Sequence, residues 1–264
     1  MITKSIGTLK RFLQKKSAPV LPEDLRIYAI GDVHGRADLL GNLLTAIAAD
    51  MQAQPVKQAV EIFLGDYVDR GSDSRTVVET LRADPRHSGQ RLCLKGNHEA
   101  MLLAFLDNPA TFSMWRRHGG LATLASYGVA LPEDPDFPDL GQLSKSFRKA
   151  FPSTHEQFLR NLATIHHQAG YTFVHAGLRP GTAMDAQTEQ DCLWIRDVFL
   201  KRSFDFGSVV VHGHSPVPTV ERYPYRINVD TGAFATGRLS CLVIEAAGLR
   251  VIRTEGAEIQ YEVF

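Results

Sequence analysis

The chain has 264 residues, of which 44% are apolar, and this length and composition suit one α/β domain with a large buried core. Its 29 basic and 29 acidic residues cancel, so no overall charge points to nucleic acid or an anionic membrane surface as a partner. No stretch approaches the roughly 18 consecutive apolar residues that a membrane span requires.

The N-terminal residues and the cysteines indicate the compartment. Residues 1–22 form a basic leader without the apolar core of a secretory signal, and we expect a flexible tail, with a membrane-surface or partner helix as the alternative. The three cysteines are unclustered, and Cys93 and Cys241 lie within apolar runs. We interpret the cysteines as buried free thiols in a reducing compartment, and therefore expect a cytoplasmic protein with its domain over 23–264.

From residue 25 the pattern alternates between strands and helices. Apolar runs predict strands over 25–30, 60–64 and 91–94, and helical spacing follows at 39–47, 76–82 and 99–106. Polar motifs lie between them: 31–35 (GDVHG), 65–71 (GDYVDRG) and 96–99 (GNHE). The motifs therefore deliver Asp, His and Asn side chains to the carboxyl ends of successive strands, where open α/β sheets bind ligands. Oxygen and imidazole donors suit divalent metals, and this set is large enough for two.

The second half of the chain begins with a helical segment. Residues 108–167 predict an insertion rather than a second domain, with helices over 114–127 and 147–162 and a Pro- and Asp-rich loop at 131–139. Strands are then expected at 171–174, 208–211, 226–229, 240–246, 249–254 and 258–263. Gly248 marks a tight hairpin turn between two of these strands.

Two further histidines, His175 in HAGL and His214 in GHSP, follow predicted strands. The ordered motifs GDVHG, GDYVDRG, GNHE, HAGL and GHSP resemble the phosphoprotein phosphatase (PPP) branch of the calcineurin-like metallophosphoesterases, in its bacterial and phage-type members. The resemblance covers residues 26–245. It implies a four-layer α/β fold, in which two mixed β-sheets pack face to face between helices, with a dinuclear metal centre at one edge.

The resemblance also implies roles for the motif residues. One divalent ion would be held by Asp32 and His34, Asp66 would bridge both ions, and the second ion would be held by Asn97, His175 and His214. His212 competes with His214 as the ligand. Mn²⁺ is our first choice, and Fe, Zn and Co also fit these donors.

Other residues are expected to bind phosphate and supply a proton. Arg70 can grip phosphate oxygens with its guanidinium fork, and Arg196 matches a Trp-x-Arg pattern of bacterial members. Lys95 and Asn97 would add to the phosphate site. In the family, His98 protonates the leaving oxygen and Asp69 orients His98. Arg116, Arg117 and His118 precede a Gly-Gly pair where bacterial members often have Asn before the pair, so their role stays open.

These features predict a metal-dependent phosphomonoester hydrolase of the protein serine/threonine phosphatase type, in which metal-activated hydroxide attacks phosphorus directly. Its substrate would be a phosphorylated protein, with phosphotyrosine or a small phosphoester left open. A symmetrical diadenosine (bis(5'-nucleosyl)) tetraphosphatase or another nucleotide phosphohydrolase is the alternative, but such enzymes usually have other residues at the positions of Asp69 and Glu99. A catalytically silent binding module is the alternative from another class, although no ligand or acid is missing. The sequence leaves the oligomeric state open.

Overall fold

The structure, a computed structural model, describes residues 19–85, 89–136 and 138–264. Most of the predicted leader lies outside the described residues. Leu21, at the end of that leader, is buried and belongs to the core, and the Pro19 carbonyl accepts a hydrogen bond from Tyr171. Within the described ranges, every helix is too short or too polar to cross a bilayer.

The first sheet has six strands in the order β11-β10-β9-β1-β2-β3. Its strands are β1 (Leu25–Ile30), β2 (Gln58–Phe63), β3 (Gln90–Cys93), β9 (Arg238–Glu245), β10 (Gly248–Glu255) and β11 (Glu258–Val263). β1, β2 and β3 are parallel, and β9 joins β1 antiparallel, so the sheet is mixed. Gly248 begins β10 opposite Glu245, which confirms the predicted hairpin.

The second sheet has five strands in the order β4-β5-β6-β8-β7. They are β4 (Ile165–Gln168), β5 (Tyr171–Val174), β6 (Val209–His212), β7 (Glu221–Arg222) and β8 (Arg226–Asn228). β5, β6 and β8 are parallel, while β4 and β7 pair antiparallel at the two edges. This sheet is therefore mixed as well.

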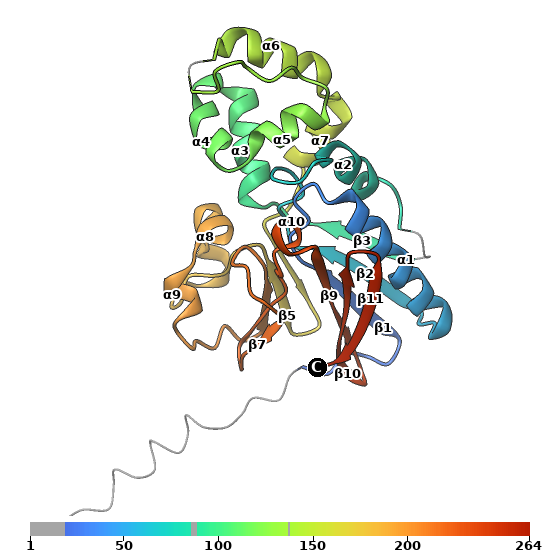
Figure 1. The fold of residues 1–264 in the computed structure, drawn as a ribbon. Coiled ribbons are helices and arrows are strands. Elements are labelled where there is room, and N and C mark those ends of the chain that lie inside the picture. The colour runs from blue at the N-terminus through green and yellow to red at the C-terminus, as the bar shows by residue number, and fades with distance from the viewer. Residues whose placement is uncertain (1–18, 86–88, 137) are drawn as a thin grey trace, which may run out of the picture.

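The two sheets pack face to face between helices, as predicted (Figure 1). Both faces of β1 are apolar, because successive side chains of a strand point to opposite faces of its sheet. Ile27 and Ala29 pack toward the second sheet, whereas Tyr28 and Ile30 pack under helices. α1 (Ala37–Ala53) and α2 (Ser74–Arg82) cover the first sheet, and α8 (Glu189–Trp194) and α9 (Asp197–Leu200) cover the second. The four layers are thus helix, sheet, sheet and helix.

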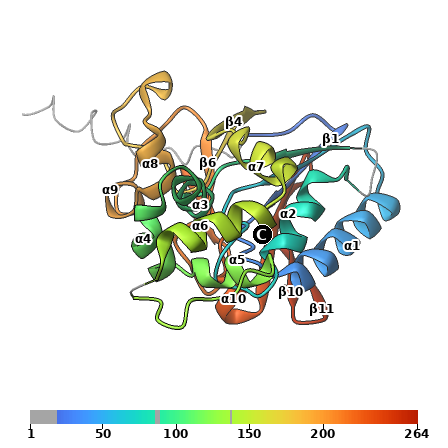
Figure 2. The same cartoon turned by 90° about the horizontal axis from the view of Figure 1, so that it is seen from above.

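Between β3 and β4 the chain is helical, and these helices form the upper part of the molecule in Figure 1 and the near side in Figure 2. They are α3 (Asn97–Asp107), the 3₁₀ turn η2 (Pro109–Thr111), α4 (Phe112–Arg117), α5 (Gly120–Ser126), α6 (Leu140–Ala150) and α7 (Ser153–Arg160). Shorter elements complete the chain: η3 (Met184–Ala186) and α10 (Ala233–Thr236).

Two predicted helices differ from the structure. The helix expected over 114–127 is two helices, because Gly119 adopts a left-handed φ of 102° between α4 and α5. The helix expected over 147–162 is also broken, since Pro152 follows Phe151 in an extended conformation and α7 begins only after it. β4 begins at Ile165, after the end of the expected helix but inside the predicted insertion over 108–167.

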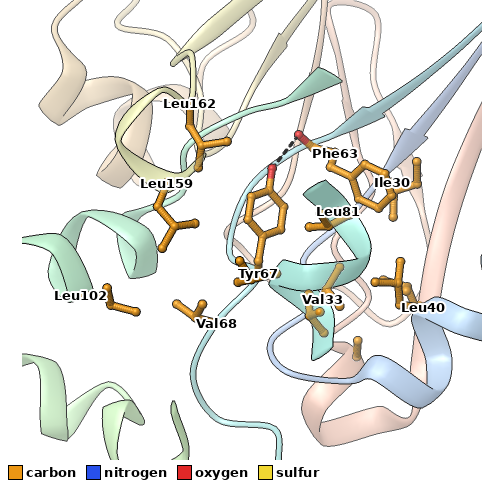
Figure 3. Close-up of a cluster of buried hydrophobic side chains, with 14 of the residues drawn as sticks. Ile30, Val33, Leu40, Phe63, Tyr67, Val68, Leu81, Leu102, Leu159 and Leu162 are labelled. Atoms are coloured by element: carbon orange, nitrogen blue, oxygen red, sulfur yellow. Dashed lines mark hydrogen bonds between the residues drawn. The ribbon is translucent and has the colours of Figure 1, made fainter. Parts of the chain in front are cut away.

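One apolar cluster supports the loop after β2 (Figure 3). The Tyr67 side chain points into this cluster, and its hydroxyl donates to the carbonyls of Phe63 at 3.2 Å and Leu94 at 2.6 Å. The second sequence motif is therefore anchored in the core.

The cysteines are free as expected, with Cys192 and Cys241 buried, but Cys93 is only partly buried because β3 is an edge strand.

Candidate metal centre

The loops after β1, β2 and β6 and the start of α3 converge on one cavity of about 170 Å³. The predicted residues that line it are Asp32, His34, Asp66, Arg70, Asn97, His98, Arg196 and His214. The other lining residues are His118, Trp194, Pro216, Asp230 and Phe234. Two more predicted residues lie behind the lining, where His175 contacts Asn97 and Asp69 contacts His98.

The backbone around this cavity is strained. Left-handed φ angles occur at His34 (45°), Asp66 (55°), Asp69 (72°), Arg70 (69°) and His214 (66°). Among the other described residues with a Cβ, only Ala169, in the turn before β5, shares this conformation. Each such residue costs on the order of 1–3 kcal/mol and persists only where its surroundings impose it, which is typical of a functional site.

His34 and Asp66 form one group of potential metal ligands. His34 Nδ1 lies 2.9 Å from the Val68 carbonyl, which can only accept, so Nδ1 carries the proton and Nε2 has a free lone pair. That Nε2 faces Asp66 Oδ2 at 3.5 Å, and His98 Nε2 lies 3.8 Å from the same oxygen. Burial lowers the pKa of His34 to about 3, so the ring is neutral and can bind a metal.

His175 is the centre of a second group. Its Nδ1 donates to the Leu64 carbonyl at 3.0 Å, so its Nε2 also has a lone pair in the neutral ring. Nε2 lies 2.9 Å from Asn97 Oδ1, 3.2 Å from His214 Nδ1 and 3.4 Å from Asp66 Oδ1. Electron pairs thus converge on one point, and the buried Nε2 of His214 has no partner among the described residues.

Two further buried carboxylates, those of Asp32 and Asp230, line the same cavity. Burial, with Asp230 and Asp66 nearby, raises the pKa of Asp32 well above its usual range. Burial likewise raises the pKa of Asp230, a cavity residue to which the sequence analysis assigned no role. Asp32 also accepts from the His214 backbone N–H at 3.1 Å. A carboxylate cluster with neutral imidazoles and an amide oxygen fits two divalent cations, since cations relieve both the charge and the lone-pair repulsion.

His98 is oriented from behind by Asp69. His98 Nδ1 lies 2.7 Å from Asp69 Oδ2, so its Nε2 faces the cavity. Asp69 in turn accepts from Trp115 Nε1 at 2.9 Å and from the Thr123 hydroxyl at 2.6 Å. Burial would lower the pKa of His98, but Asp66 and Asp69 outweigh it and raise the pKa above the ordinary value. This arrangement favours a protonated ring that can donate to a bound group.

The two arginines at the cavity have no acidic partner among the described residues. Arg70 Nη2 lies 3.4 Å from His98 Nε2, and Arg196 Nη1 donates to the Ser215 hydroxyl at 3.2 Å. No carboxylate in the described part of the chain lies within 4.0 Å of either guanidinium. Lys95 differs, because its amine pairs with Glu189 at 3.0 Å and it is not among the described residues that line the cavity.

The residues whose roles the sequence left open differ in whether they reach the cavity. His118 reaches the cavity, with its ring centroid 6.1 Å from that of His98, while Arg116 pairs with Asp136 and Arg117 donates to the Ser113 carbonyl. His212 lies behind His214, with Nδ1 against the Gly213 carbonyl, and is not part of the lining.

Glu99 organises the loop that carries Asp66. Its buried carboxylate accepts hydrogen bonds of 2.7 to 3.3 Å from the backbone N–H groups of Asp66, Tyr67, Val68 and Gly96. Gly96 must be glycine here, since a Cβ would lie 2.8 Å from this carboxylate and still closer to Asp66. The GNHE motif therefore both supplies Asn97 and His98 and shapes the loop opposite.

Comparison with known proteins agrees with this geometry. A model of the calcineurin-like phosphoesterase family matches residues 25–235. The asymmetrical bis(5'-nucleosyl)-tetraphosphatase PrpE of Bacillus thuringiensis is 25% identical over 81% of this chain and 88% of its own length. Serine/threonine-protein phosphatase 2 of Salmonella typhimurium is 27% identical over 83% of this chain and 93% of its own length.

Two further comparisons are more limited. The zinc-dependent endopolyphosphatase of Saccharomyces cerevisiae is 32% identical over 108 residues, and this chain spans only 31% of its length. The crystal structure of a cold-active protein-tyrosine phosphatase from Shewanella superposes over 93% of this chain and 83% of that chain, with a TM-score of 0.62 at 17% identity. At that identity the likeness concerns the fold. The resemblance based on the motifs is confirmed.

Proposed function

Since the chain belongs to the calcineurin-like phosphoesterase family, we propose that it is a phosphomonoester hydrolase of the protein phosphatase type, acting on phosphoserine and phosphothreonine. One observation carries the proposal: ligand lone pairs converge beside His175, while two arginines that have no acidic partner in the described ranges face the same cavity. The first feature calls for cations and the second for an anion. A cavity of about 170 Å³ that holds both suits a phosphoryl group on metal ions.

The proposed metal ligands fall into two sets. Asp32, His34 and Asp66 would hold one ion, and Asp66 with Asn97, His175 and His214 would hold the other. Two divalent ions, with Mn²⁺ as our first candidate and Fe, Zn or Co as the others, would supply Lewis-acid activation of water and of the phosphoryl group. The three free cysteines support a reducing, cytoplasmic setting for this reaction.

The chain's own groups would then orient the ester and protonate its leaving oxygen. Arg70 and Arg196 can each offer two N–H donors to phosphoryl oxygens and stabilise the charge there. His98 would give the Nε2 proton to the departing oxygen, so that the ester leaves as an alcohol. Asp69 would keep this imidazole in place and balance its charge before the transfer.

The choice between ester classes rests on two side chains. Asp69 and Glu99 match the protein phosphatase forms of their motifs, and both have several hydrogen-bond partners in the structure. Relatives named as a nucleosyl-tetraphosphatase and as a protein phosphatase match the chain over similar lengths. A bis(5'-nucleosyl)-tetraphosphatase is therefore the second candidate.

Hydrolysis of a substrate panel tests the proposal. Metal-loaded protein is assayed with phosphoserine and phosphotyrosine peptides, p-nitrophenyl phosphate and diadenosine tetraphosphate, and phosphate release is measured. We expect the highest kcat/KM on the phosphoserine peptide. A higher kcat/KM on diadenosine tetraphosphate would identify the chain as the second candidate, a bis(5'-nucleosyl)-tetraphosphatase. If no ester is hydrolysed, the remaining alternative is a catalytically silent binding module.

A further inference from the structure

Arg70 is held at the cavity by an aromatic ring. The Arg70 guanidinium carbon lies 4.6 Å from the centroid of the Phe234 ring, and both residues line the cavity. Arg70 is otherwise exposed, and its own backbone is left-handed. Its remaining contacts are weak: Nη2 lies 3.4 Å from His98 Nε2, and the backbone N–H donates to the Gly119 carbonyl at 3.3 Å. The ring is thus its principal side-chain support among the described residues.

The position of Phe234 is fixed by its own helix. Gly232 precedes α10 in a left-handed conformation, and the Ala233 carbonyl accepts a hydrogen bond from Arg36 Nη1 at 3.0 Å. The Thr236 hydroxyl closes the other side of this turn by donating to the Thr231 carbonyl at 2.8 Å. The Phe234 ring also meets His34 edge-on, with centroids 5.4 Å apart. Phe234 therefore stands between a proposed metal ligand and a proposed phosphate ligand.

An aromatic face supports a cation differently from a carboxylate. A carboxylate would bind the same guanidinium N–H groups that a phosphate needs, and its charge would repel the phosphate. A ring attracts the cation through its quadrupole and leaves the N–H edges free. The contact to Phe234 thus orders a long, flexible side chain without reducing its capacity to bind an anion.

We infer that Phe234 is a positioning residue for substrate binding: it holds the Arg70 guanidinium in the orientation that grips the phosphoryl group. The inference rests on the proposed function, because it takes Arg70 as a phosphate ligand. It adds a residue outside all five motifs, on α10, to the determinants of phosphate affinity.

A double-mutant cycle tests the inference. The dissociation constant of inorganic phosphate for metal-loaded protein is measured by calorimetry for the wild type, Phe234→Leu, Arg70→Ala and the double variant. Cation–π contacts at exposed sites predict a roughly two- to fivefold loss of phosphate affinity in Phe234→Leu. In the Arg70→Ala background, Phe234→Leu should cause no further loss. Phe234→Tyr keeps the ring face and should bind phosphate as the wild type does.

Phe204→Leu is the matched control, since Phe204 is 37% exposed against 36% for Phe234 but lies outside this cavity. Equal losses from Phe234→Leu in both backgrounds, or a fall in bound metal measured by elemental analysis, would overturn the inference, because Phe234 would then act on substrate or His34 directly. Unchanged affinity in Phe234→Leu would also overturn it. These results are separate from the hydrolysis panel. If the wild type hydrolyses its ester and Phe234→Leu binds phosphate with unchanged affinity, the inference is refuted while the proposed function stands.

Discussion

Asp66 is the carboxylate that reaches both groups of ligand atoms in the described structure, with Oδ2 toward His34 and Oδ1 toward His175. Asp66→Asn should therefore reduce turnover more than about a hundredfold, since changes to mere hydrogen-bonding partners of metal ligands already cost 10–100-fold. Bound metal, measured by elemental analysis, should fall to one ion or fewer. The exposed Asp107→Asn is the control. Two tightly bound ions in an active Asp66→Asn protein would contradict the bridging role.

The role of His98 can be separated from that of the metals by the leaving group. An acid matters most when the departing oxygen is strongly basic, and it typically contributes about 10²–10⁴-fold. His98→Asn should lose about that factor in kcat on a phosphoserine peptide and visibly less on p-nitrophenyl phosphate, with both metals retained. Equal losses on the two esters would show that the proton comes from another group.

At the scale of elements, α4 and α5 hold the loop after β2 from outside. Trp115 on α4 and Thr123 on α5 donate to Asp69, and the Gly119 carbonyl between these helices accepts the Arg70 N–H. The helical segment thus completes the site. Our interpretation of residues 108–167 as an insertion within one domain stays a prediction.

This dependence can be measured with Trp115→Phe. The substitution keeps an aromatic body beside Phe105 and Phe147 but removes the N–H bonds to both Asp69 oxygens. We expect roughly a tenfold lower kcat on the phosphoserine peptide, because outer hydrogen bonds of this kind are worth about 10–100-fold. Metal content and the affinity for phosphate should not change. A loss confined to KM would show that Trp115 supports substrate binding rather than the acid.

Elements with a strong local signal could be predicted from the sequence, and contacts between distant elements could not. Asp32, Asp66 and Asn97 directly follow apolar strand runs, so their convergence at one sheet edge followed from parallel pairing. Trp115 and Thr123 are far from Asp69 in sequence, and only the packing of α4 and α5 reveals that they meet. α8, α9 and α10 have four to six residues, too few for a helical period to show.

At the scale of the whole molecule, an ionic cluster lies at the opposite end of β1 from the site. Asp50 on α1 accepts from Tyr28 at 2.6 Å and pairs with Arg26 at 3.2 Å and Arg250 at 3.0 Å. Burial alone would raise the pKa of Asp50, but hydrogen bonds from Arg250 and Tyr28 bring the pKa below its ordinary value. Ionised Asp50 therefore stabilises the fold fully above about pH 4, the ordinary pKa of this side chain in the unfolded chain. The stabilisation is lost as the pH falls through the lower pKa that Asp50 has in the folded state.

Asp50→Asn should lower the free energy of unfolding at pH 7 by roughly 1–3 kcal/mol, because the Arg26 and Arg250 guanidinium groups lose one of their two carboxylate partners and keep only Glu245. The difference from wild type should shrink below about pH 4, where the carboxylate itself becomes protonated. Urea unfolding at pH 7, 5 and 3 measures both effects, with the exposed Asp197→Asn as control. A difference that stays constant from pH 7 to pH 3 would contradict the assignment.

Both tryptophans of the chain stand at the site. Trp115 hydrogen-bonds to Asp69, and the Trp194 ring lies at the cavity with its centroid 6.2 Å from that of His214. Indole emission responds to nearby charge and hydrogen bonding, so the tryptophan fluorescence of the protein originates within a few side chains of the proposed metal and phosphate positions. Unlabelled protein thus contains its own optical reporter, and titrating Mn²⁺ or phosphate into it should change the emission as the cavity fills.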